Sequence, residues 1–274
     1  MPTRVTRVFL SLLLLSSVAV CQRSGDVRPE KEAFKDVKNW PATKPGDVQL
    51  KNFRPFRAVY ERAYSGPKGD LRVDRVIMTA EEVGWDGKRA ALITLIDSAD
   101  AKWEDAAARN LFMIIDLDDM QLLFESGPIP GKAKDYYFMR PDTGMGTMIT
   151  TESGTSQTRE FPKGAVGFGP GPWALGSLDL KEGARIRLDP FISPAANIFG
   201  TRSGIVKGRR EFTDLSGKSH TGWLLESGGK LASSRMGQIY VTDQPPYLLA
   251  RFSVDLDSGK ETRGVRLKKF QYLE

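Results

Sequence analysis

The segment that decides the fold is PYLLARFSVDLDSGKETRGVRLKKF, residues 246–270. Its first half alternates two sets of side chains, Leu248, Ala250, Phe252 and Val254 against Leu249, Arg251, Ser253 and Asp255. Successive side chains of a strand point to opposite faces, so this alternation predicts a half-buried strand. The DSGK that follows is typical of a chain reversal, because these residues favour turn conformations. We therefore expect two antiparallel strands joined by a hairpin.

The same scheme recurs along the chain, where strand-length segments alternate with turn signals. GPKG (66–69), WDGK (85–88) and DLSGK (214–218) each follow a segment rich in apolar and β-branched residues. Strands joined in this way predict an antiparallel sheet, and the lack of alternating strand and helix patterns disfavours a doubly wound α/β fold.

Helix signals are few. SADAKWEDAAARNL (98–111) has an Ala-rich body, and GPWALGSLDLKEG (171–183) predicts a helical turn at its start. The fold class expected is therefore mainly β, a large curved antiparallel sheet forming a half-barrel or open barrel with one or two short helices.

Three regions follow from composition. Residues 1–21 predict a signal peptide, which can also be a lipoprotein signal; residues 22–51 predict a polar tether; residues 52–274 predict a single β-rich domain. The signal has positive charge at Arg4 and Arg7 and an apolar run over residues 8–15, too short to span a bilayer as an ordinary helix.

Cys21, the only cysteine, admits two interpretations. A signal peptidase can cleave after Ala19 and release the chain, or VAVC (18–21) can act as a lipobox, so that Cys21 carries a lipid anchor. The bulky Val20 favours release, whereas the polar segment after Cys21 suits a tethered lipoprotein. We expect an exported protein, periplasmic or held at the membrane through lipidated Cys21 alone.

Charge and cysteine content limit the function further. The chain has 40 Lys and Arg against 34 Asp and Glu, a net charge of +6, and loss of residues 1–21 removes two basic residues and leaves +4. The basic residues are scattered, whereas nucleic-acid binding favours a concentrated basic stripe, so no nucleic-acid partner is expected. One cysteine cannot form an internal disulfide, so the core must stabilise the domain.

Candidate chemical sites are weak. One histidine, His220, and one cysteine cannot supply a zinc site, so no metal is expected. No other cofactor is expected either. Asp214, Ser216 and His220 fall within one predicted turn, which disfavours a catalytic triad. The acids of DLDD (116–119) suit a turn better than calcium. Pairing Asp116 or Asp118 with Glu125 keeps an envelope hydrolase as an alternative, but no catalytic residue is predicted.

The second half resembles a known family. WALGSLDLKEGARIRLDPF (173–191), SGIVKGRREFTDLSGKSHTGWLLES (203–227) and GQIYVTDQPPYLLARFSVDLDSGKETRGVRLKKF (237–270) are similar to an exported bacterial domain family of unknown function. That family resembles the lipoprotein-carrier (Lol-type) half-barrels, in which a curved antiparallel sheet wraps a helix or an apolar ligand. The resemblance covers roughly residues 53–274 and implies no catalytic residue.

These observations predict a non-enzymatic envelope protein that binds an apolar or amphipathic ligand. The ligand is expected to be a lipid or a lipoprotein, and an envelope protein partner or a structural role are the alternatives. A curved sheet can present apolar side chains toward such a ligand, and the candidates are Trp223, Tyr240, Leu248 and Phe252.

Overall fold

The computed structural model describes most of the chain from residue 34 onward: residues 34, 36–43, 50, 52–65, 71–98, 110–129, 132–150, 154–160, 166–167, 171–193, 198–228, 235–255 and 261–274. The predicted signal segment, with Cys21, lies outside these residues, as does much of the predicted tether. Within the described ranges, no helix has the length and hydrophobicity needed to cross a membrane.

One sheet, built from two antiparallel meanders, makes up almost all of the fold. The first meander comprises β2 (Phe56–Ser65), β3 (Leu71–Trp85), β4 (Lys88–Ser98), β5 (Leu111–Asp116), β6 (Leu122–Ile129), β7 (Lys132–Arg140), β8 (Met145–Thr150) and β9 (Thr155–Glu160). The second comprises β11 (Arg185–Ser193), β12 (Ile198–Thr213), β13 (Ser219–Gly228), β14 (Arg235–Val241), β15 (Leu248–Asp255) and β16 (Glu261–Tyr272). The predicted fold class, a large antiparallel sheet, is confirmed.

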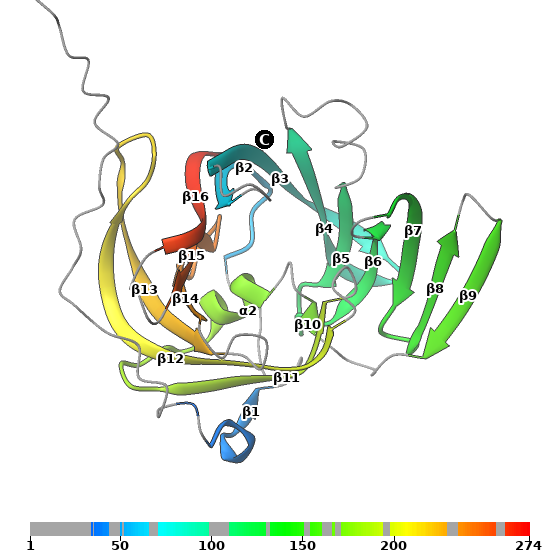
Figure 1. Cartoon of the computed structure of the whole chain (residues 1–274), viewed down its shortest axis with the longest axis horizontal. Helices are drawn as coiled ribbons and strands as arrows, with labels where there is room; N and C mark the ends of the chain where they lie inside the picture. The colour runs from blue at the N-terminus through cyan, green and yellow to red at the C-terminus, as the bar shows by residue number, and fades with distance from the viewer. Residues whose placement is uncertain are drawn as a thin grey trace, which may run out of the picture.

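The last strand joins the two meanders. β16 pairs with β2, in a register that runs from Arg263 opposite Tyr64 to Tyr272 opposite Phe56. The strand order therefore begins at β1, passes through β16 and β2, and ends at β9, which leaves the sheet open. Figure 1 shows this sheet curling around a central helix, with β7, β8 and β9 extending away from it.

Two short strands depart from the antiparallel pattern. β1 (Ala42–Thr43) and β10 (Val166–Gly167) both pair with β11 in parallel. β1 follows the 3-10 helix η2 (Val37–Asn39) and the buried Trp40. Part of the range predicted as a tether therefore packs against the sheet, because Trp40 buries its ring and β1 completes part of the edge of β11. A two-residue strand is too short to produce a sequence pattern.

The helix α2 (Gly171–Ser177) lies inside the curve of the sheet (Figure 1). Its Trp173 is fully buried, with ring centroids 5.3 Å from Phe56 and 5.2 Å from Tyr247. Gly176 permits a close approach to β14, because a Cβ atom there would lie 2.1 Å from the carbonyl oxygen of Thr242. The predicted helical turn at residue 171 is confirmed, and it lies inside the curve of the sheet against β14 and β15.

Turn chemistry sets the strand ends. Asp86 and Gly87, with φ values of 47° and 78°, connect β3 to β4, as an Asp-Gly hairpin requires. The DLSGK turn lies between β12 and β13. The predicted helix over 98–111 falls mainly outside the described residues, and its two end residues belong to β4 and β5.

Replacing Trp173 by alanine should remove the largest buried side chain from the interior. We expect the free energy of unfolding to fall by about 3–5 kcal/mol, because the cavity cannot be refilled by neighbouring strands. Urea denaturation measures the change. Tyr272→Ala, at an aromatic residue that is 38% exposed, is the control and should cost much less; equal losses for both variants would contradict the central role of α2.

Candidate ligand-binding site on the inner face

The face of the sheet that covers α2 carries a continuous buried row. Phe56, which contacts Trp173, lies opposite Ala80 on β3, and the strand registers continue the row through Ile93, Met113, Glu125 and Met139. All six side chains are at most 1% exposed. We call the face that carries this row the inner face. The row therefore lies within the buried core of the sheet.

The same face also carries half-buried apolar side chains. They lie on the side of the buried row where β3, β5 and β16 begin and β4 ends. They pack against the buried core but remain partly accessible: Val76, Leu95, Leu111 and Val265. Leu95 lies opposite both Met78 and Leu111, so these residues continue the core outward. We call these four residues the apolar rim. The apolar rim therefore leaves part of the apolar surface of the inner face accessible.

An ion pair borders the apolar rim. Arg62 on β2 lies opposite Val265 and donates to Asp74 on β3, with Nε–Oδ1 and Nη2–Oδ2 distances of 2.8 and 2.5 Å. Arg251 lies opposite Val265 from the other side. Asp74 is buried and Arg62 and Arg251 are half-buried. The rim is therefore apolar with charged groups beside it, an arrangement that suits an amphipathic ligand.

Glu125 places a carboxyl group within the otherwise apolar row. The Tyr137 hydroxyl donates to its Oε1 at 2.7 Å, while Oε2 is buried without a hydrogen-bond partner. Burial raises the pKa of Glu125 to about 7, against the opposing effect of the Tyr137 hydrogen bond. A carboxyl group in this environment favours its neutral form, in which it can donate a hydrogen bond.

A bulge decides which way Glu125 points. Ile115 lies opposite Leu122, but Ile114 lies opposite Phe124, so β6 contains one extra residue. Strict alternation from the buried Leu122 would direct Glu125 to the other face. Alternation along LLFESG (122–127) therefore assigns Glu125 to the wrong face of the sheet. The sequence does show an acid within an apolar strand, which indicates an unusual position.

The four residues predicted to face an apolar ligand do not gather in one place. Tyr240 and Phe252 share a face, with ring centroids 6.1 Å apart, and Phe212 lies 5.3 Å from Tyr240. Trp223 pairs with Val241, one residue beyond Tyr240, so its side chain lies on the opposite face. Leu248 is buried, and its carbonyl oxygen accepts a hydrogen bond from the Tyr60 hydroxyl at 3.0 Å.

The Asp214 cluster is a turn. Asp214 Oδ1 accepts hydrogen bonds from the Ser216 amide and hydroxyl and from the Lys218 amide, and Oδ2 lies 2.8 Å from His220 Nε2. Burial raises the pKa of Asp214, but these hydrogen bonds outweigh it and lower the pKa overall. A catalytic triad places histidine between the nucleophile and the acid. Here aspartate is central, so the cluster organises the hairpin.

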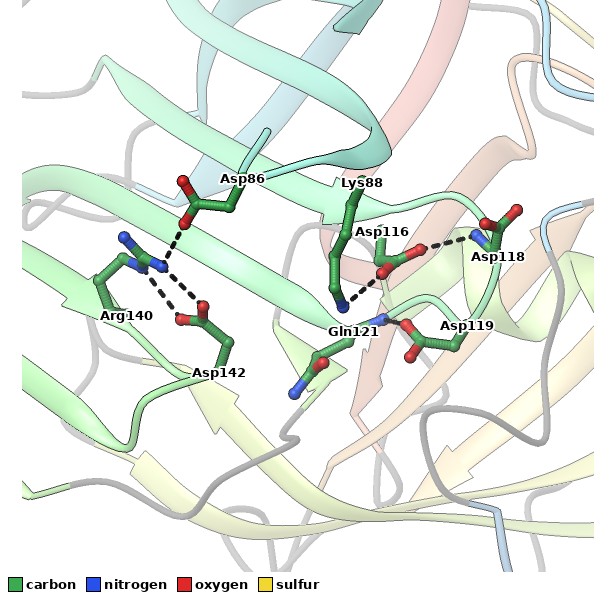
Figure 2. Close-up of polar contacts among 8 residues, drawn as sticks. All are labelled: Asp86, Lys88, Asp116, Asp118, Asp119, Gln121, Arg140 and Asp142. Carbon is green, nitrogen blue, oxygen red and sulfur yellow. Dashed lines mark hydrogen bonds and ion pairs between the residues drawn. The ribbon is translucent and has the colours of Figure 1, made fainter. Parts of the chain in front are cut away.

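Three hairpin turns of the first meander are tied together by charged groups (Figure 2). Lys88 donates to Asp116 at 2.7 Å, and Arg140 bridges Asp86 and Asp142, at 2.8 Å from each. Asp116 also accepts from the backbone amide of Asp118. These contacts support the turn interpretation of DLDD. Among the described residues, no group of three or more His, Cys, Asp or Glu side chains is arranged to hold a metal ion.

Two of the carboxylates suggested for a hydrolase, Asp116 and Glu125, lie on opposite faces of the sheet. Asp116 follows Ile115, an inner-face residue opposite Ala91, and therefore points to the outer face. Glu125 is on the inner face. Asp116 and Glu125 therefore cannot flank one glycosidic bond in this fold.

No protein-family model matches the chain, and neither does any curated protein. Among solved structures, the chain is similar to the β-barrel-like protein of domain of unknown function DUF1849 from Brucella abortus, with 11% identity and a TM-score of 0.44 over 83% of this chain and 100% of that chain. It is also similar to MucB, with 8% identity and a TM-score of 0.34 over 84% of this chain and 56% of that chain. Neither likeness assigns a role to a residue of this chain.

Glu125→Gln should change how stability depends on pH. Burial raises the pKa of the Glu125 carboxyl from its ordinary 4.5 to about 7, so the folded state loses stability as pH rises from about 5 to about 8. Glutamine cannot ionise, so its advantage over wild type should grow by on the order of 3 kcal/mol across this range. Urea denaturation at each pH measures it, with the exposed Glu81→Gln as control; parallel curves for wild type and Glu125→Gln would contradict the assignment.

Proposed function

We propose that the protein is a non-enzymatic binding module of the bacterial cell envelope, which holds an apolar or amphipathic ligand at the apolar rim. The observation that carries the proposal is the contrast along the inner face. In the row that begins at Phe56 the side chains are at most 1% exposed, whereas Val76, Leu95, Leu111 and Val265 remain half-buried over the same core. Covering them with hydrocarbon would contribute about 25 cal/mol for each Å² of apolar surface buried.

The charged groups beside the rim favour an amphipathic ligand over a purely apolar one. Arg62 and Arg251 lie on either side of Val265, so a polar head group has charged neighbours while its chain covers the rim. A lipid and the acylated end of a lipoprotein share this chemistry. The separation of Asp116 from Glu125 supports a binding module over the hydrolase alternative.

Export is part of the proposal, supported by the Arg4 and Arg7 charges and the apolar run that follows. We expect cleavage after Ala19 and a soluble chain that begins at Val20. Intact-mass measurement of protein purified gently from its own envelope tests this. A mass increased by acyl groups on Cys21 would instead establish a lipid-anchored protein and contradict release.

Leu95→Asp should weaken binding, because the charge lies within the apolar rim. We expect its affinity for parinaric acid, a fluorescent fatty acid, to fall at least about tenfold, since one charged group beside the hydrocarbon costs more than about 1.4 kcal/mol. Ile96→Asp is the matched control: Ile96 is the next residue, is 41% exposed and points to the outer face.

Circular dichroism and urea denaturation of both variants establish that they fold. The ligand-binding proposal fails if wild type does not bind parinaric acid, or if the Leu95 and Ile96 variants lose the same affinity. The first outcome would favour a docking or structural role.

A further inference from the structure

The carboxyl group of Glu125 has a hydrogen-bonding position that the protein leaves unused. Oε1 accepts from the Tyr137 hydroxyl at 2.7 Å, whereas Oε2 is buried without a partner. An unsatisfied buried polar atom is destabilising, and native proteins contain few of them. Glu125 lies between Met113 and Met139, in a row without other polar side chains. A polar group of a ligand that bound at this position would satisfy Oε2.

Only Gly127 and Leu111 separate this carboxyl group from the rest of the apolar rim along the inner face. Gly127 is two residues beyond Glu125 on β6, on the same face, and its lack of a side chain lets Leu111 pack directly against its backbone. A Cβ atom on Gly127 would lie 2.9 Å from Leu111 Cδ1 and 3.4 Å from the Tyr137 hydroxyl. Leu111, a rim residue, therefore lies over Gly127 and beside that hydroxyl. Rotation of the half-buried Leu111 side chain would open a path from the rim toward Glu125, and the flexible Met113 and Met139 can adjust around a ligand.

The chemistry of the carboxyl group selects the ligand. Its apolar surroundings favour the neutral form. Oε1 already accepts from Tyr137, so in the neutral form the proton on Oε2 is available to donate. Its natural partner is an acceptor without charge, such as a carbonyl oxygen.

We propose that Glu125 anchors the ester carbonyl oxygen of an acyl ligand whose hydrocarbon chain covers the apolar rim. This inference rests on the ligand-binding function proposed above and adds the chemical group that the site recognises. Tyr137 is a positioning residue, because its hydroxyl fixes the orientation of the carboxyl group.

Displacement of parinaric acid by two probes of similar hydrocarbon length tests the inference. Methyl palmitate carries an ester carbonyl and hexadecane does not. At pH 6 we expect wild type to prefer the ester about tenfold, the usual effect of one hydrogen bond. Glu125→Met, which matches its two methionine neighbours, should lower this ratio to about one. Glu125→Gln should keep it, because the amide still donates a hydrogen bond.

Gly127→Ala gives a second test that leaves the carboxyl group in place. The added methyl group should occupy the path beside Leu111 and lower the ester preference, while urea denaturation verifies folding. Loss of the ester preference in Glu125→Met and Gly127→Ala, with retention in Glu125→Gln, is the expected result.

Two outcomes separate this inference from the proposed function. If wild type binds parinaric acid but prefers neither probe, or if Glu125→Met keeps the ester preference, the Glu125 inference is overturned and ligand binding stands. If wild type binds no probe, the proposed function fails and the inference fails with it.

Discussion

The pairing of β16 with β2 holds the two halves of the molecule in one sheet. Each meander consists of neighbours in sequence, but this pairing brings together strands from opposite ends of the described domain. The ion pair of Lys268 with Glu61 and the hydrogen bond from Tyr60 to the Leu248 carbonyl reinforce it across 207 and 188 residues of sequence. Loop-closure entropy grows only slowly with length, so such a long-range closure costs little more than a shorter one once both meanders exist.

Curvature of the joined sheet gives its two faces different environments. α2 enters the curve and buries Trp173 against Phe56 and Tyr247. One helix of seven residues covers only part of such a face. The inner face therefore changes along the strands, from the fully buried row that begins at Phe56 to the half-buried apolar rim. This change, rather than a set of catalytic groups, is the feature on which the proposed function depends.

Local irregularities in strand pairing decide which side chains point inward. The extra residue in β6 turns Glu125 inward, and a second irregularity between β14 and β15 accompanies the burial of both Leu248 and Leu249. A bulge interrupts the regular hydrogen bonding between two strands at one position. Here it directs the Glu125 carboxyl group into the buried apolar row of the inner face. The resulting carboxyl group combines burial, a single hydrogen-bond donor and proximity to the rim.

The sequence by itself determined the mainly β class, the turns at Asp86–Gly87 and in DLSGK, and the short helix at residue 171, because these depend on neighbours along the chain. The alternation of residues 248–255 also predicted a strand there, which the structure confirms. The tertiary structure alone decided that β16 pairs with β2, that Trp223 and Tyr240 lie on opposite faces, and that Glu125 faces inward. The reason is physical: side-chain direction follows a period of two only until a bulge shifts it, and partners distant in sequence leave no local pattern.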